Sequence, residues 1–210
     1  MLFQILFSTI LNFYLMKNTI KILGNNNLAN NFLTSIHSLV NCFLSFYSIF
    51  YQNNILFKPI MVYSIGHLLC DTYYFQYKID INKSKNVYIL HHSIFMCSWL
   101  LVFYDMNLIN YLLYLLLSEI TILPLNLKYH FKKNKNHQLE LLFGVITYVL
   151  FFIFRIINFS FHLYLFIKNK NLIVLSFFIP LLFLQYYLFG LMTLKVLEKL
   201  NIIQNLLYIW

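Results

Sequence analysis

The chain has 210 residues, of which 61% are hydrophobic and 10% are charged, with a net charge of +9 and a mean hydropathy of +0.71. Soluble domains are about 45–50% apolar and about 25% charged, so this composition excludes a water-soluble globule and indicates a chain that crosses a bilayer. The positive charge does not indicate nucleic-acid binding, because the lysines lie between apolar runs, where they contact anionic headgroups.

Seven apolar runs are predicted to form membrane helices, because one crossing needs about 20 mostly apolar residues. No small-residue cleavage site follows the first run, which is therefore interpreted as a helix and not as a signal peptide. The sixth run is longer than one crossing and is expected to tilt. In chain order the runs cover residues 2–16, 32–51, 59–77, 87–104, 108–127, 139–167 and 172–197.

These runs predict an all-α, polytopic membrane bundle of about seven helices that encloses a lipid-binding cavity. Residues 1–31 are expected to form an N-terminal transmembrane helix and loop, residues 32–200 the multi-pass bundle, and residues 201–210 a C-terminal tail.

The lysines predict the orientation of the bundle. Segments after the odd-numbered runs hold eleven lysines, against three after the even-numbered runs. Because cytosolic loops carry the excess of positive charge, the N-terminus is expected outside or in a lumen and the C-terminus in the cytosol.

Ionisable residues inside the third and fourth runs are functional candidates, since such residues are costly in lipid. His67 and Asp71 are spaced i, i+4, with Tyr74 two turns from His67, so a helix places all three on one face. Either the carboxylate orients a histidine at a catalytic or metal site, or the groups form an interhelical hydrogen-bond network. His91 and His92 point about 100° apart, so only one is expected to face a cavity.

The fifth run carries a carboxylate, Glu119, deep among apolar residues, with Asn126 two turns along the same face. Pro124 lies between them, where it removes a backbone donor and is expected to kink the helix. An uncompensated carboxylate at this depth costs several kcal/mol, so Glu119 is expected to be protonated, paired or exposed to a polar cavity.

The sixth run places Arg155, Asn158 and His162 on one face by their i, i+3, i+7 spacing. Because the guanidinium keeps its charge, Glu119 and Asp71 are expected to balance Arg155. A polar cavity is therefore predicted, lined by His67, Asp71, Glu119, Asn126, Arg155 and Asn158.

The order of these groups resembles the TLC-domain family, named for TRAM, Lag and CLN proteins, over residues 63–187. The similar stretches are "YSIGHLLCDTYYFQYK", "YILHHSIFMCSWLL", "LSEITILPLNLKYHF" and "FFIFRIINF". The resemblance implies that His91 and His92 match the family's paired histidines, which lie at the acyl-transfer centre in its ceramide synthase branch. It likewise matches Asp71 to an early acidic residue, Glu119 and Asn126 to an "SE…LN" helix, and Phe154-Arg155-Ile156 to an "F-R-I" step.

Two departures favour the short, non-synthase members of that family. The residues after the histidine pair lack the second His-Asp step of ceramide synthases, and Gln185 and Tyr187 stand where the family often has Asn and Trp. The resemblance to the short members implies a role in membrane lipid composition.

Two functions follow as hypotheses. The first is a protein that binds lipid or acyl chains within its helices, influences membrane lipid composition and uses no cofactor. The alternative is a ceramide-synthase-like N- or O-acyltransferase, in which His91 or His92 is catalytic and acyl-CoA is the substrate. Under either hypothesis, the expected partners of the protein are membrane lipids, with sphingolipid or phospholipid acyl chains as candidates. The expected membrane is the endoplasmic reticulum or another internal membrane.

A third hypothesis is a metal-dependent hydrolase using His67, Asp71 and one of the paired histidines. No HxxxH or HExxH pattern supports it, and no metal is expected. The cysteines, at positions 42, 70 and 97, show neither ligand-pair spacing nor a disulfide framework.

Overall fold

The computed structural model describes residues 1–52, 54–77, 85–104, 108–169 and 172–199, and within these ranges the chain is helical, without a strand. The predicted all-α class is therefore confirmed. The elements are α1 (Leu2–Leu23), α2 (Asn26–Phe50), η1 (Asn54–Leu56), α3 (Phe57–Tyr77), α4 (Lys85–Tyr104), α5 (Ile109–Leu116), η3 (Leu117–Thr121), α6 (Ile122–Lys133), α7 (His137–Phe151), η4 (Phe152–Ile157), α8 (Asn158–Lys168) and α9 (Leu172–Lys199).

Each of the seven predicted runs lies in one helical stretch, two of which contain an irregular turn. The fifth run became α5, η3 and α6 in direct succession, and the sixth became α7, η4 and α8. The first helix runs past residue 16 to Leu23 and is capped by Gly24, whose φ of 64° is a left-handed conformation that glycine adopts without strain. The second begins six residues before its apolar run, because the Asn25 side chain accepts from Leu28 N and caps it.

Among the described residues, four helical stretches are long and apolar enough to cross a membrane: Asn26–Phe50, Ile109–Lys133, His137–Lys168 and Val174–Glu198. The apolar part of α4, Ile89–Val102, is shorter. These stretches support a multi-pass membrane protein, whereas crossings by α1, α3 and α4 stay a prediction.

Helix α2 turns its small and polar side chains inward and its large apolar ones outward. Phe43 and Phe46 are 70% and 59% exposed. Its buried residues are Ala29, Asn30, His37, Ser38, Asn41, Cys42, Ser45 and Ser48. A soluble helix shows the opposite pattern, whereas membrane helices pack through small residues and expose their apolar side chains to lipid.

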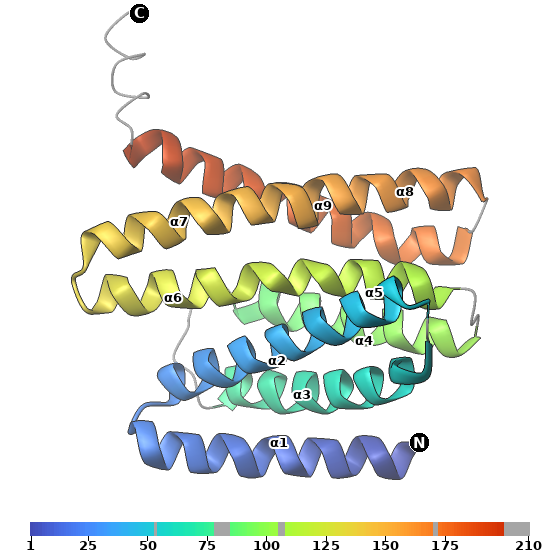
Figure 1. The fold of residues 1–210 in the computed structure, drawn as a ribbon, viewed down its shortest axis with the longest axis horizontal. Helices are drawn as coiled ribbons and strands as arrows, with labels where there is room; N and C mark the ends of the chain where they lie inside the picture. Colours follow the sequence, from blue (N-terminus) through green and yellow to red (C-terminus); the bar gives the residue numbers. More distant parts are fainter. Residues whose placement is uncertain (53, 78–84, 105–107, 170–171, 200–210) are drawn as a thin grey trace, which may run out of the picture.

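Helix α2 also lies at the centre of the bundle, where it contacts α1, α3, α5, η3 and α6 (Figure 1). The rods α5–η3–α6 and α7–η4–α8 are joined at Lys133 and His137 by a short turn and lie side by side, with α9 packed on the second. The turn is closed by Asn136, whose side chain accepts from Leu139 N at 3.2 Å.

Helix α1 packs closely on α3 because Gly66 has no side chain. A Cβ at this position would lie 2.7 Å from Ser8 Cβ and 2.9 Å from the Ser8 backbone carbon. The close approach brings polar residues of α1 and α3 together inside the bundle.

Candidate functional site

Two irregular turns face each other in the bundle and carry the acidic and basic residues of the fifth and sixth runs. Glu119 lies in the 3₁₀ turn η3 and Arg155 in the π-helical turn η4, and the two turns are in contact. Turns of both kinds inside long helices often mark functional or strained positions.

Side chains of α2 bind backbone carbonyls in and next to the turn η3. Pro124 has no N–H to donate to the carbonyl one turn before it. On the facing side, Ser38 Oγ donates to the Glu119 carbonyl, and Cys42 Sγ lies 3.7 Å from the carbonyls of Leu116 and Leu117. At the position where Pro124 predicted a kink, the helix contains a 3₁₀ turn that packs against small residues of α2.

Arg155 is buried and is held by neutral groups. Its Nε donates to Thr121 Oγ1 at 3.0 Å and its Nη1 to Gln185 Oε1 at 3.1 Å, while the guanidinium carbon lies 5.2 Å from the centre of the Phe151 ring. No carboxylate oxygen of the described residues lies within 4.0 Å of it. Neither Glu119 nor Asp71, the residues expected to balance Arg155, therefore forms a contact ion pair with it.

Asp71 and His92 meet across α3 and α4. His92 Nε2 lies 3.7 Å from Asp71 Oδ2, and His92 Nδ1 shares a hydrogen bond of 3.1 Å with Thr72 Oγ1. Asp71 and His92 are buried. A hydroxyl, an imidazole and a carboxylate in this order could activate a nucleophile, but both imidazole nitrogens are directed at α3.

His67 joins a second polar network and does not pair with Asp71. Its Nδ1 lies 3.4 Å from Asn12 Oδ1 of α1, and its ring stacks on that of His37 at 3.9 Å. His37 Nε2 in turn bonds to the Asn41 amide at 2.9 Å. Of the two interpretations of the third run, this favours the interhelical network.

Sequence reasoning missed His37, Asn12 and Asn41. The signal was present, since Ser38, Asn41 and Ser45 recur at helical spacing within an apolar run and share a face.

The remaining predicted residues take no part in the hydrogen bonds of these networks, although the His91 ring lies 5.9 Å from that of His92. His91 is half-buried, and its ring lies 6.0 Å from that of Phe95. Asn126 Nδ2 donates to Asn31 O and Ser35 Oγ, both at 2.9 Å, and ties α6 to α2.

Arg155 and Asn158 contact different neighbours, although α-helical spacing predicted one shared face. Asn158 Nδ2 donates to the Tyr114 carbonyl at 2.9 Å, on α5. The π-helical turn ends immediately before Asn158 and shifts the helical register between the two residues.

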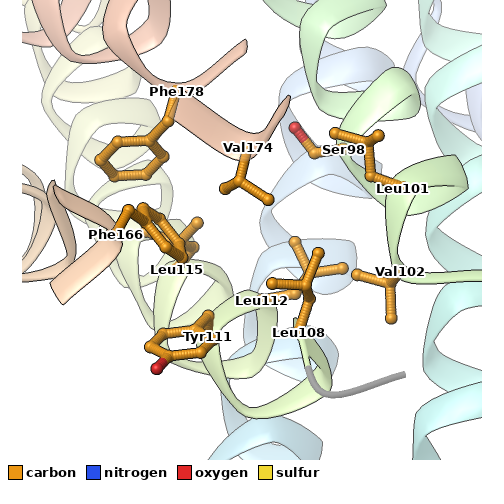
Figure 2. A pocket seen from close by; sticks show the side chains of 10 residues that line it. All are labelled: Ser98, Leu101, Val102, Leu108, Tyr111, Leu112, Leu115, Phe166, Val174 and Phe178. Atoms are coloured by element: carbon orange, nitrogen blue, oxygen red, sulfur yellow. The ribbon is translucent and has the colours of Figure 1, made fainter. Parts of the chain in front are cut away.

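Two pockets lie next to each other beside α5. The first, of about 40 Å³, is lined by Ser98, Leu101, Val102, Leu108, Tyr111, Leu112, Leu115, Phe166, Val174 and Phe178 (Figure 2). The second, of about 470 Å³, lies between α5 and α8 and is lined by Asn110, Tyr111, Tyr114, Asn158, Phe161, His162 and Leu165.

Tyr111 lines both pockets. Figure 2 shows its ring at the edge of the first pocket, with the hydroxyl directed away from the aliphatic side chains. Of the six residues predicted to line a polar cavity, only Asn158 lines either pocket, and neither His91 nor His92 does. The histidine pair and the pockets are thus different parts of the molecule.

Within the described residues, no group of three or more His, Cys, Asp or Glu side chains is arranged to hold a metal ion. His67, Asp71 and a paired histidine, the ligands of the hydrolase interpretation, do not form such a group. The three cysteines are free thiols.

The family model for the TLC domain of TRAM, LAG1 and CLN8 proteins matches residues 1–204. No curated protein and no solved structure matches the chain. The match covers all seven predicted runs, including the N-terminal helix.

Proposed function

The chain belongs to the TLC-domain family, and on this premise we propose that it binds a membrane lipid and thereby influences the lipid composition of its membrane. The observation that carries the proposal is the pair of adjoining pockets beside α5. The first pocket is lined mainly by apolar side chains, and the second mixes amide, phenol and imidazole groups with aromatic rings. A lipid has the same two parts, an apolar chain and a polar head.

The sizes of the pockets suggest how such a lipid would lie. The second pocket, at about 470 Å³, falls within the range of about 300–1,000 Å³ typical of small-molecule sites. The first, at about 40 Å³, is smaller than the about 150 Å³ that encloses benzene. We therefore expect one short segment of an acyl chain in the first pocket and the rest of that chain along the lipid-facing surface.

The other parts of this proposal come from the sequence. The missing second His-Asp step favours a short, non-synthase member of the family. The excess of lysines after odd-numbered runs supports a cytosolic C-terminus in a bundle of seven crossings. The membrane proposed is the endoplasmic reticulum or another internal membrane.

Acyl transfer is not favoured as the function. Thr72, His92 and Asp71 have the order that nucleophile activation needs, but neither described pocket reaches them. Incubating the purified chain with labelled acyl-CoA and mixed lipid acceptors tests this directly. A product that is lost in the His91→Phe and His92→Phe variants would restore the acyltransferase hypothesis.

Photo-crosslinking tests lipid binding. The full chain is placed in phosphatidylcholine nanodiscs with a lipid that carries a diazirine in its acyl chain, and the labelled peptides are identified by mass spectrometry. We expect labelling to concentrate on α4, α5 and α8 near the pockets. Equal labelling of lipid-facing α7 would contradict the proposal.

A matched pair of tryptophan variants adds a control. Leu101 lines the first pocket, whereas its neighbour Leu100 is 58% exposed and does not. Leu101→Trp should fill the pocket and reduce labelling there, and Leu100→Trp should leave the labelling unchanged.

A further inference from the structure

The larger pocket has His162 as its buried polar group. His162 is 2% exposed and lines the pocket, whereas Phe161 beside it is 56% exposed. The rings of Tyr111, Tyr114 and Phe161 surround its imidazole at centroid distances of 5.5 to 5.8 Å. These rings hold the buried imidazole at the wall of the pocket.

The hydrogen bond on the other nitrogen identifies the tautomer. His162 Nδ1 lies 2.8 Å from the Asn158 backbone carbonyl, which can only accept, so Nδ1 must carry a hydrogen. In a neutral ring, Nε2 is then an acceptor. The side chain of Asn158 adds a second acceptor, because its nitrogen already donates to the Tyr114 carbonyl.

The pocket has no charge of its own. Its described lining residues are two asparagines, two tyrosines, a histidine, a phenylalanine and a leucine. A phosphate headgroup is normally bound through Arg or Lys, with charge-assisted hydrogen bonds. The described lining therefore offers no counter-charge to a phosphate, and its imidazole and amide acceptors suit a headgroup that donates a hydrogen bond.

We propose that the pocket between α5 and α8 binds the head of an uncharged lipid with a free hydroxyl, such as a diacylglycerol or a long-chain alcohol. The hydroxyl donates to His162 Nε2, and the chain passes Tyr111 toward the apolar pocket. This inference rests on the proposed lipid binding and names the class of lipid.

Competition between two headgroups on the same acyl chains tests the inference. The wild-type chain in phosphatidylcholine nanodiscs is labelled with a diazirine-bearing diacylglycerol. Unlabelled dioleoylglycerol or dioleoyl phosphatidic acid then competes. We expect the diacylglycerol to compete at about one tenth of the concentration that phosphatidic acid needs, since one hydrogen bond corresponds to about a factor of ten.

A matched pair of histidine variants locates the effect. His162→Phe keeps an aromatic ring but removes Nε2, and should reduce labelling of α5 and α8 about tenfold. His130→Phe changes an exposed histidine at the end of α6 and should not reduce it. The competition needs no variant, so it remains decisive if His162→Phe does not fold.

The outcomes distinguish a failure of the hydroxyl-lipid site from a failure of the proposed lipid binding. If phosphatidic acid competes equally well, or folded His162→Phe is labelled like the wild type, the hydroxyl-lipid site is wrong while lipid binding stands. If neither the diacylglycerol probe nor the diazirine-bearing lipid of the first crosslinking experiment labels α5 and α8 above α7, both are wrong.

Discussion

Replacing Gln185 by leucine should destabilise the bundle, because it removes the acceptor of an Arg155 hydrogen bond. Gln185 is fully buried, and its Oε1 lies 3.1 Å from Arg155 Nη1. Such a bond to a charged group contributes about 1.5–3 kcal/mol in soluble proteins. In membrane bundles the measured couplings average about 0.6 and reach about 1.7 kcal/mol, because the unfolded chain also finds polar partners.

We expect Gln185→Leu to cost about 1–2 kcal/mol of unfolding free energy. The bond from Arg155 Nε to Thr121 remains and limits the loss. The double variant Arg155→Met/Gln185→Leu should be more stable than the sum of the two single effects predicts, by about 1 kcal/mol, because no buried charge is then left short of a partner.

The assay is reversible unfolding by sodium dodecyl sulfate in mixed micelles, followed by the fluorescence of Trp99. This residue is fully buried, and Trp210, the other tryptophan, is replaced by phenylalanine in every variant. The free energy follows from linear extrapolation. Tyr187→Leu, at a side chain that is 60% exposed, is the control and should change little. Unchanged stability of Gln185→Leu, or strictly additive effects, would refute the reasoning.

Further predictions concern packing, thiol burial and orientation. Gly66→Ala should destabilise the chain by about 1–3 kcal/mol by overpacking against Ser8, and Ser8→Gly should recover part of this loss in the same unfolding assay. N-ethylmaleimide should modify the half-buried Cys97 faster than the buried Cys42 and Cys70, with all three reacting in denaturant, and mass spectrometry of timed samples checks this. A tag at the C-terminus should be cleaved by protease added to the cytosolic side of sealed vesicles, and protection of the tag would contradict the proposed orientation.

The helical stretches follow from the sequence because each depends on a local property. An apolar run must satisfy its backbone hydrogen bonds within itself in a bilayer, so a run of sufficient length predicts a helix. Pro124 likewise predicted a break in the regular α-helix, because the missing N–H removes a hydrogen bond within its own helix. The family could also be recognised from the sequence, because the resemblance depends on the order of polar residues along the chain.

The partners of the polar side chains did not follow from spacing. The i, i+4 pattern places His67 and Asp71 on one face, yet His67 contacts α1 and α2 while Asp71 contacts His92 of α4. Spacing defines which side chains share a face, but not which helix covers each part of that face.

The sequence by itself therefore determined an all-helical membrane bundle of the TLC family with a polar interior. Only the tertiary structure decided that Arg155 is held by Thr121 and Gln185, and that His162 faces a pocket. The physical reason is distance: these hydrogen bonds join residues that are 30 or more positions apart, except for the bond of His162 within its own helix. Which acceptor each donor reaches depends on how the helices pack, and the π-helical turn at Arg155 changes that packing in a way that regular helical spacing does not predict.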